Sequence, residues 1–293
     1  MQKELTLQQI GPHSYWLPPD SATDRPALGV VAGTHGALLV DVGNSPAHAN
    51  VLQRELAAHR ITPRFAMLTH WHWDHVFGAA TLDLPTFAHA ETARIVRAMA
   101  GLDWSDAALD ERVAAGTEIA FCRDMLKAEM PDRSALVIRP PEIIFEKQIT
   151  LDLGGVTCTI MHVGGDHAHD SSIVSVPADR VAFLGDCFYD DLHHGDRRLT
   201  CAELFPLLGR LLALGAETYI GGHDPAPLTR ATFAEDAALL RQIGELVAEI
   251  GDDRAAVLAG LPGRTGLPVV PDHIEIADAF LAGLRLPCAP SVL

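Results

Sequence analysis

The sequence predicts an α/β fold, a sheet sandwich flanked by helices, with a polar site along one edge. Three observations predict it. Apolar runs of strand length recur along the chain, helical segments lie between and after them, and several of the runs end on histidine or aspartate. Short apolar runs bounded by turn residues are typical of buried strands. At 293 residues and 48% hydrophobic content, the chain can bury one large core or two small ones.

The first 60 residues predict short strands followed by a helix. Residues 28–32 and 37–42 are strand-like, and the turn Gly33–Gly36 between them is typical of a hairpin. Either Asn44 or Ser45 can cap a helix that runs to about residue 59.

The next apolar run leads into Thr-His-Trp-His-Trp-Asp-His, residues 69–75. Side chains two apart on a strand leave the same face, so His70 and His72 can reach one point. Asp74 and His75 follow in the turn and can reach a second point nearby. Imidazole nitrogen and carboxylate oxygen suit zinc and other first-row divalent metals. Purely structural histidines would each need a buried hydrogen-bond partner, so the block favours two neighbouring metal ions, an arrangement typical of hydrolysis.

Later strands are expected to complete the ligand sets, because a catalytic zinc takes about three protein ligands plus water. The apolar run 181–185 ends on Asp186, and the run 218–220 ends on His223 after two glycines. A third segment, 163–172, follows another strand and offers further histidines.

Helices are predicted in two further regions. Residues 90–130 have helical composition, with Ser105 as an N-cap, and form either a lid over the site or ordinary packing helices. Strands return over 142–161, and helices follow at about 229–250, 252–260 and 272–284. No long linker is present, so we expect residues 1–293 to form one domain with a helical insertion at about 90–130 and C-terminal helices at about 229–290.

Composition limits the partners. The net charge of −16 without a basic run disfavours nucleic acid, and no apolar run approaches the ~20 residues that cross a membrane. Five scattered cysteines predict reduced thiols, and the first residues lack a secretory signal, so we expect a cytoplasmic location.

The chain resembles the metallo-β-lactamase superfamily of hydrolases. The matching features occur in the family's order: Leu38–Asp41, the His-x-His-x-Asp-His block, His167 followed by Asp170–Ser171, Asp186, and His223. The resemblance implies a four-layer αββα sandwich with extra helices. It also implies two divalent metal ions, for which zinc is the favoured metal and manganese or iron are alternatives.

The resemblance assigns a role to each matching residue. One metal ion would be held by His70, His72 and His167, and the other by Asp74, His75 and His223. Asp186 would bridge the two, and Asp41 would support the metal-binding loop from behind. His193 and His194 fit a polar loop near the site better than a ligand role.

The resemblance further implies a hydrolase of a small molecule. Asp186 stands where one group of zinc β-lactamases has cysteine, which favours a lactone, ester or thioester as the bond cleaved. Asp74 or Asp186 would position or transfer a proton, and Tyr189, at the spacing found in lactonases, would support the substrate carbonyl oxygen. The alternatives are a β-lactam or phosphodiester hydrolase, a mono-iron sulfur dioxygenase, and a non-catalytic metal-binding protein. The sequence does not indicate an oligomeric state.

Overall fold

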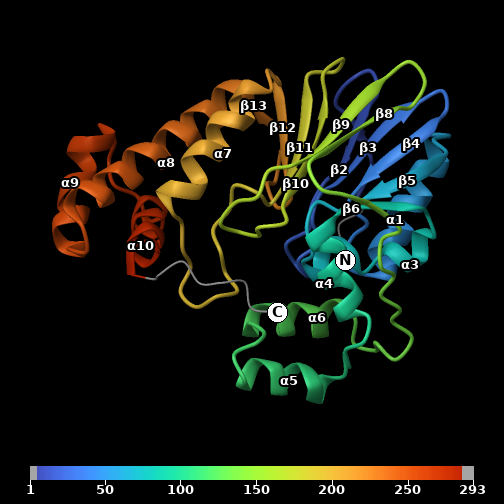
Figure 1. Ribbon diagram of the computed structural model, residues 1–293, viewed down its shortest axis with the longest axis horizontal. Coiled ribbons are helices and arrows are strands. Elements are labelled where there is room, and N and C mark those ends of the chain that lie inside the picture. The colour runs from blue at the N-terminus through green and yellow to red at the C-terminus, as the bar shows by residue number, and fades with distance from the viewer. Residues whose placement is uncertain (1–4, 286–293) are drawn as a thin grey trace.

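A computed structural model describes residues 5–285, and its strands form two mixed sheets that pack face to face (Figure 1). The first sheet has the order β1 (Gln8–Gln9), β2 (Ser14–Leu17), β3 (Leu28–Gly33), β4 (Gly36–Val40), β5 (Pro63–Met67), β6 (Thr86–His89) and β7 (Ile143–Phe145). The second has the order β13 (Leu228–Thr229), β12 (Thr218–Gly221), β11 (Val181–Gly185), β10 (Ser172–Val176), β9 (Thr157–His162) and β8 (Gln148–Asp152).

Each sheet contains parallel neighbours, and these position the loops of interest. In the first sheet β4, β5, β6 and β7 run parallel, whereas β1 to β4 form antiparallel hairpins. In the second sheet β11 pairs with β12 in parallel, and the other pairs are antiparallel. Parallel strands end at the same sheet edge, so loops that follow β4 and β5, or β11 and β12, leave the sandwich side by side.

Helices cover both outer faces of the sandwich (Figure 1). Beside the first sheet lie α1 (Pro46–Ala58), α2 (Trp73–Val76), α3 (Ala79–Leu82) and α4 (Ala90–Met99). Next along the chain come α5 (Asp106–Ala114) and α6 (Ala120–Glu129). Beside the second sheet lie α7 (Cys201–Ala213) and α8 (Arg230–Ile250), against which α9 (Arg254–Thr265) and α10 (Pro271–Arg285) pack.

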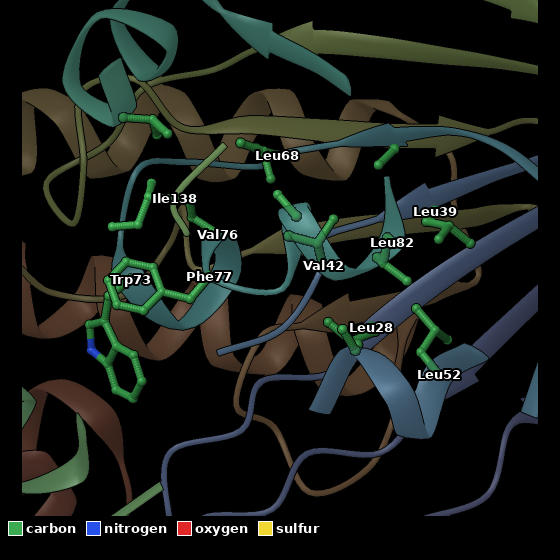
Figure 2. Close-up of a cluster of buried hydrophobic side chains, with 14 of the residues drawn as sticks. Leu28, Leu39, Val42, Leu52, Leu68, Trp73, Val76, Phe77, Leu82 and Ile138 are labelled. Carbon is green, nitrogen blue, oxygen red and sulfur yellow. The ribbon is translucent and has the colours of Figure 1, made fainter. Parts of the chain in front are cut away.

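Three hydrophobic layers hold these elements together. One lies between the first sheet and its helices; Figure 2 shows part of it, including Leu39, Leu52 and Phe77. The second lies between the sheets and contains Val31 and Phe183, and the third joins the second sheet to α7, α8 and α10. Three apolar layers between four structural layers confirm the predicted αββα sandwich.

Most predicted elements are confirmed, with local differences. Ser45 rather than Asn44 caps α1, because its hydroxyl accepts a hydrogen bond from the His48 N–H at 3.0 Å. Helix α7 was not predicted, and α9 runs past the expected end at residue 260 to Thr265. The last part of the predicted C-terminal helices, residues 286–290, lies outside the described residues.

The insertion at 90–130 divides into parts with different surroundings. Helix α4 packs into the first hydrophobic layer, and α5 begins at the predicted cap Ser105. At the end of α6, Glu129 has a buried side chain that pairs with Arg25 at 2.8 Å and accepts a hydrogen bond from Ser45 at 2.5 Å. Helix α6 is therefore fixed to the loop before β3. Within residues 5–285, none of the helices combines the length and the apolar character needed to cross a bilayer.

Candidate metal centre

The predicted ligands meet at one edge of the sandwich, where most of them follow strands with a parallel neighbour and His167 lies in the connection between β9 and β10. The His-x-His-x-Asp-His block follows β5 and continues into α2. Asp186 follows β11 and His223 follows β12, and these two strands pair with Gly185 opposite Gly221. The register places the two side chains next to each other, so the strand pairing itself assembles the site.

Two groups of side chains could each hold a metal ion. The first consists of His70, His72 and His167, and the second of Asp74, His75, Asp186 and His223. Within each group, one nitrogen or oxygen atom per residue lies within 4.8 Å of all the others. The structure thus brings together all seven residues that the sequence predicted as ligands.

Asp186 lies between the two groups. Its Oδ2 atom is 3.3 Å from Nε2 of His223, 3.4 Å from Nε2 of both His75 and His167, and 3.9 Å from Nε2 of His70. Donor atoms about 2.0–2.1 Å from a tetrahedral zinc ion lie roughly 3.4 Å apart. The spacing is therefore that of ligands around ions, with one carboxylate oxygen within reach of both groups.

The polar atoms that point into the site also fit metal ions. Among the described residues, Nε2 of His70, His75 and His167 and Oδ1 of Asp186 are buried without a hydrogen-bond partner. A buried polar atom without a partner costs about 1–3 kcal/mol, and a divalent cation would satisfy these atoms together. The donor set, imidazole and carboxylate, is the set that zinc and similar ions prefer. The residues present therefore fit a pair of divalent ions.

The protonation states of these histidines and of Asp186 also suit metal binding. Burial, together with neighbouring imidazoles such as His75, lowers the pKa of His70 well below its ordinary value, and burial and His193 do the same for His72. Both rings are therefore neutral near pH 7, with a lone pair available. Burial opposes ionisation of Asp186, but the nearby His75 and His223 outweigh it and hold the pKa well below its ordinary value.

Asp41 holds the metal-binding loop through hydrogen bonds to residues next to the ligands and to one ligand, as the resemblance implied. Its Oδ1 accepts a hydrogen bond from the Thr69 backbone at 2.7 Å, and its Oδ2 accepts bonds from the Thr69 hydroxyl and from His75 Nδ1, both at 2.8 Å. The Thr69 hydroxyl is in turn 3.0 Å from His70 Nδ1. Asp41 has φ 62°, a left-handed conformation that is costly for a residue with a side chain and is found at functional sites. These bonds keep a proton on Nδ1 of both rings and direct Nε2 into the site, where a bound cation would replace any proton that Nε2 carries.

Gly222 allows the close approach of backbone to carboxylate. A Cβ atom at this position would lie 2.0 Å from Asp186 Oδ1 and 3.1 Å from His75 Cε1. Gly222 is therefore required by the space that Asp186 occupies, whereas a Cβ atom at Gly221 would lie 2.1 Å from Asp224 Oδ2 and 2.7 Å from the Tyr189 hydroxyl. The sequence signal of a strand ending in Gly-Gly-His thus has a steric cause.

Tyr189 lines the same cavity, and its hydroxyl accepts a hydrogen bond from the His223 N–H at 3.2 Å. Burial, with the neighbouring Asp224 and Asp186 carboxylates, raises the pKa of Tyr189 well above its ordinary value, so the phenol keeps its proton. A protonated phenol has one hydrogen bond to donate, and the neighbouring Asp224 carboxylate is one acceptor for it.

The cavity beside the ligands has a volume of about 460 Å³. Its walls come from the start of α6, from the connection between β11 and α7, and from α8 and α10. The apolar part of this wall consists of Ile119, Phe121, Phe188, Leu192, Leu199, Leu240, Ile276 and Ala279. Of the predicted lid, residues 90–130, only the stretch 119–122 therefore contributes side chains to the cavity wall.

Some residues of the site were not predicted. Asp24 Oδ1 lies 3.5 Å from His223 Nδ1, and the Asp190 carbonyl oxygen accepts a hydrogen bond from His167 Nδ1 at 2.9 Å. Asp24 lies in a turn-rich segment and Asp190 in a loop, so neither carries a periodic signal. His193 lines the cavity, as expected for the polar loop, whereas His194 turns to Asp191 at 2.9 Å.

Comparison with known proteins agrees with this geometry. The family model of the metallo-beta-lactamase superfamily matches residues 27–223, about two thirds of the chain. The protein therefore belongs to the metallo-beta-lactamase superfamily, which consists largely of metal-dependent hydrolases. No curated protein sequence matches the chain.

Solved structures share the fold at low sequence identity. A metallo-beta-lactamase family protein from Thermus thermophilus is 19% identical with a TM-score of 0.59, and 94% of each chain is covered. A metallo-beta-lactamase from Pontibacter korlensis is 18% identical with a TM-score of 0.55, covering 81% of this chain and 99% of its own. The DIM-1 metallo-beta-lactamase is 16% identical with a TM-score of 0.55, covering 80% and 96%. These likenesses concern the fold.

Proposed function

We propose that this protein is a metal-dependent hydrolase that cleaves a lactone, ester or thioester bond of a small molecule at a binuclear metal centre. The observation that supports the proposal most strongly is the position of Asp186, whose Oδ2 lies 3.3–3.9 Å from Nε2 of four histidines in two ligand groups. His70, His72 and His167 would hold one ion, and Asp74, His75 and His223 the other. Two bound divalent ions would supply an acidified water and polarise a carbonyl oxygen.

The chain's own groups would orient the substrate and move its protons. Asp74 Oδ2 lies 3.1 Å from Nε2 of both His75 and His223, and the carboxylate lines the cavity, where it can accept and release a proton. Tyr189 would donate a hydrogen bond to the carbonyl oxygen as negative charge develops on it. Asp186 would keep the two ligand groups at a fixed separation.

The cavity wall favours an uncharged reacting group with an apolar arm. Eight apolar side chains line it, whereas its charged lining beyond Asp74 and Asp186 consists of Asp24, Asp190, Asp272, Glu275 and a single cation, Arg197. Two bound divalent ions would offset the carboxylates at the ligand groups, but Asp272 and Glu275 on α10 disfavour an anionic group on the substrate's arm. Lactones, esters and thioesters with an alkyl or acyl chain fit both features.

A substrate panel tests the proposal. Purified protein with its metal content measured would be assayed against lactones, thioesters, esters, phosphodiesters and β-lactams. Turnover confined to the ester-like group, lost in Asp186→Asn and retained in Asp110→Asn, would support it; Asp110 is an exposed carboxylate on α5 and serves as the matched control. Preference for β-lactams or phosphodiesters in fully loaded protein would refute the substrate class.

A further inference from the structure

A third group of potential ligands lies outside the two described above. It consists of Glu118, Cys122 and His193, whose carboxylate oxygen, sulfur and ring nitrogen all lie within 4.8 Å of one another. Glu118 and Cys122 belong to the start of the α6 region, and His193 belongs to the connection between β11 and α7. The group therefore joins two segments that are 71 residues apart in sequence (Cys122 to His193) and that both line the cavity.

The surroundings of the three side chains resemble those of a ligand site. Cys122 is 5% exposed, and Glu118 and His193 are half-buried. Within residues 5–285, no protein hydrogen bond to a ring nitrogen of His193 is present; only its backbone N–H is bonded, to Asp191 at 2.9 Å. The His193 ring lies against His72, with centroids 4.3 Å apart, which fixes its position beside the wall. Burial of a carboxyl, a thiol and an imidazole together is costly unless they share a partner.

We propose that Glu118, Cys122 and His193 form a separate site for a soft divalent cation of the zinc class, which fastens the start of α6 to the β11–α7 connection. Thiolate, imidazole and carboxylate are the ligands that zinc takes, with a fourth position left for water. A tetrahedral ion with bonds of about 2.0–2.3 Å needs donor atoms roughly 3.3–3.8 Å apart, so rotamer changes of about 1 Å close the site. Binding forms a bond to sulfur and releases the Cys122 thiol proton to solvent, without oxidation or reduction.

The ion-free state sets a condition on binding. Burial, together with Glu118, raises the pKa of the Cys122 thiol well above its ordinary value, so the thiol is protonated and unreactive without a cation. A cation must displace this proton, so its affinity for the site should rise with pH. This inference does not require the proposed hydrolase activity.

Cobalt titration tests the site, because a cobalt–thiolate bond gives a charge-transfer absorption in the near ultraviolet that imidazole and carboxylate ligands do not give. We expect wild-type protein to show this band as a further equivalent binds beyond those of the histidine-rich groups. Cys122→Ser should lose the band and that equivalent, whereas Cys201→Ser, a matched control at a cysteine outside the group, should keep both. His193→Gln and Glu118→Gln should keep the fold and weaken cobalt binding at least ten-fold.

The outcomes separate this inference from the proposed function. A band that is absent from wild-type protein, or that persists in Cys122→Ser, would overturn the thiolate site. A wild-type band that depends on Cys122, in protein without two further equivalents, would support this site while contradicting the binuclear centre. Retained cobalt affinity in both His193→Gln and Glu118→Gln would also overturn the three-residue assignment.

Discussion

Asp41→Asn perturbs the metal centre without touching a predicted ligand. The carboxylate is 2% exposed and accepts three hydrogen bonds, one on Oδ1 and two on Oδ2. The Thr69 backbone N–H cannot turn away, so the asparagine oxygen must stay opposite it, and the new NH₂ then faces His75 Nδ1. Two donors cannot pair, and His75 is driven to carry its proton on Nε2, the atom that points into the second ligand group.

The magnitude follows from these contacts. Loss of a residue that orients a metal-binding histidine lowers metal affinity by about 10–100-fold, which corresponds to about 1.4–2.7 kcal/mol. One unpaired buried donor costs about 1–3 kcal/mol of folding stability, less than the ~5–15 kcal/mol typical of a domain. We therefore expect Asp41→Asn to fold, with a weakened second metal site.

The assay is a zinc competition titration against a chromophoric chelator, with circular dichroism to confirm folding. Thr69→Val is the matched variant, because it removes the hydroxyl that contacts His70 Nδ1 at 3.0 Å and keeps the hydrogen bond that His75 Nδ1 donates to Asp41. We expect Asp41→Asn to weaken the second site and Thr69→Val to weaken the first. Unchanged zinc affinity at both sites in folded Asp41→Asn would refute the tautomer argument.

Three further predictions concern the cavity and the buried acids. Each methylene added to the substrate's apolar arm should raise kcat/KM about four-fold until the cavity is filled, because burial of one CH₂ contributes about 0.8 kcal/mol. A kcat/KM that does not change along a series of homologous esters would contradict the apolar-arm proposal. Tyr189→Phe should lower kcat and kcat/KM together by on the order of 10²-fold with unchanged metal content; loss of metal instead would make Tyr189 a support for His223. Burial raises the pKa of Asp170 to about 7 from an ordinary 3.8, so the folded state binds this proton more tightly than the unfolded state does. The free energy of unfolding should therefore fall as pH rises from about 4 to 7, by at most about 4 kcal/mol. Chemical denaturation should show this fall in the wild type and not in Asp170→Asn, and identical pH profiles would show that Asp170 does not titrate in that window.

Most of the ligands were predictable from sequence because they directly follow strands that have a parallel neighbour, and parallel strands end at the same sheet edge. His167 lies instead in the connection between the antiparallel strands β9 and β10. The spacing in residues 69–75 and the terminal Asp186 and His223 carry that signal locally. Supporting contacts were harder to predict. Asp24, which lies 3.5 Å from His223, stands in a loop that is held by the pairing of Arg25 with Glu129, an interaction between residues 104 apart in sequence. No local pattern encodes such a contact.

Dependence on tertiary packing also explains what the sequence did not predict about the 90–130 insertion and helix α7. Helical composition predicted α4 to α6, but their separate surroundings depend on tertiary packing: α4 contributes to the core, whereas residues 119–122 reach the cavity. Helix α7 has Pro206 in its interior, and this residue obscured a helical pattern whose buried leucines, including Leu204 and Leu211, pack on the second sheet. The structure accommodates the proline because packing outweighs local propensity.

The number of metal ions held by the histidine-rich groups tests the central claim most directly. The measurement is native mass spectrometry of zinc-loaded Cys122→Ser protein, which lacks the proposed thiolate ligand, compared with the same protein carrying Asp186→Ala. We predict two zinc ions in the first protein and a loss of at least one after removal of Asp186, whose Oδ2 lies within 3.9 Å of histidines from both groups. A single zinc ion in the fully loaded first protein, or two firmly bound ions without Asp186, would contradict the bridged binuclear centre.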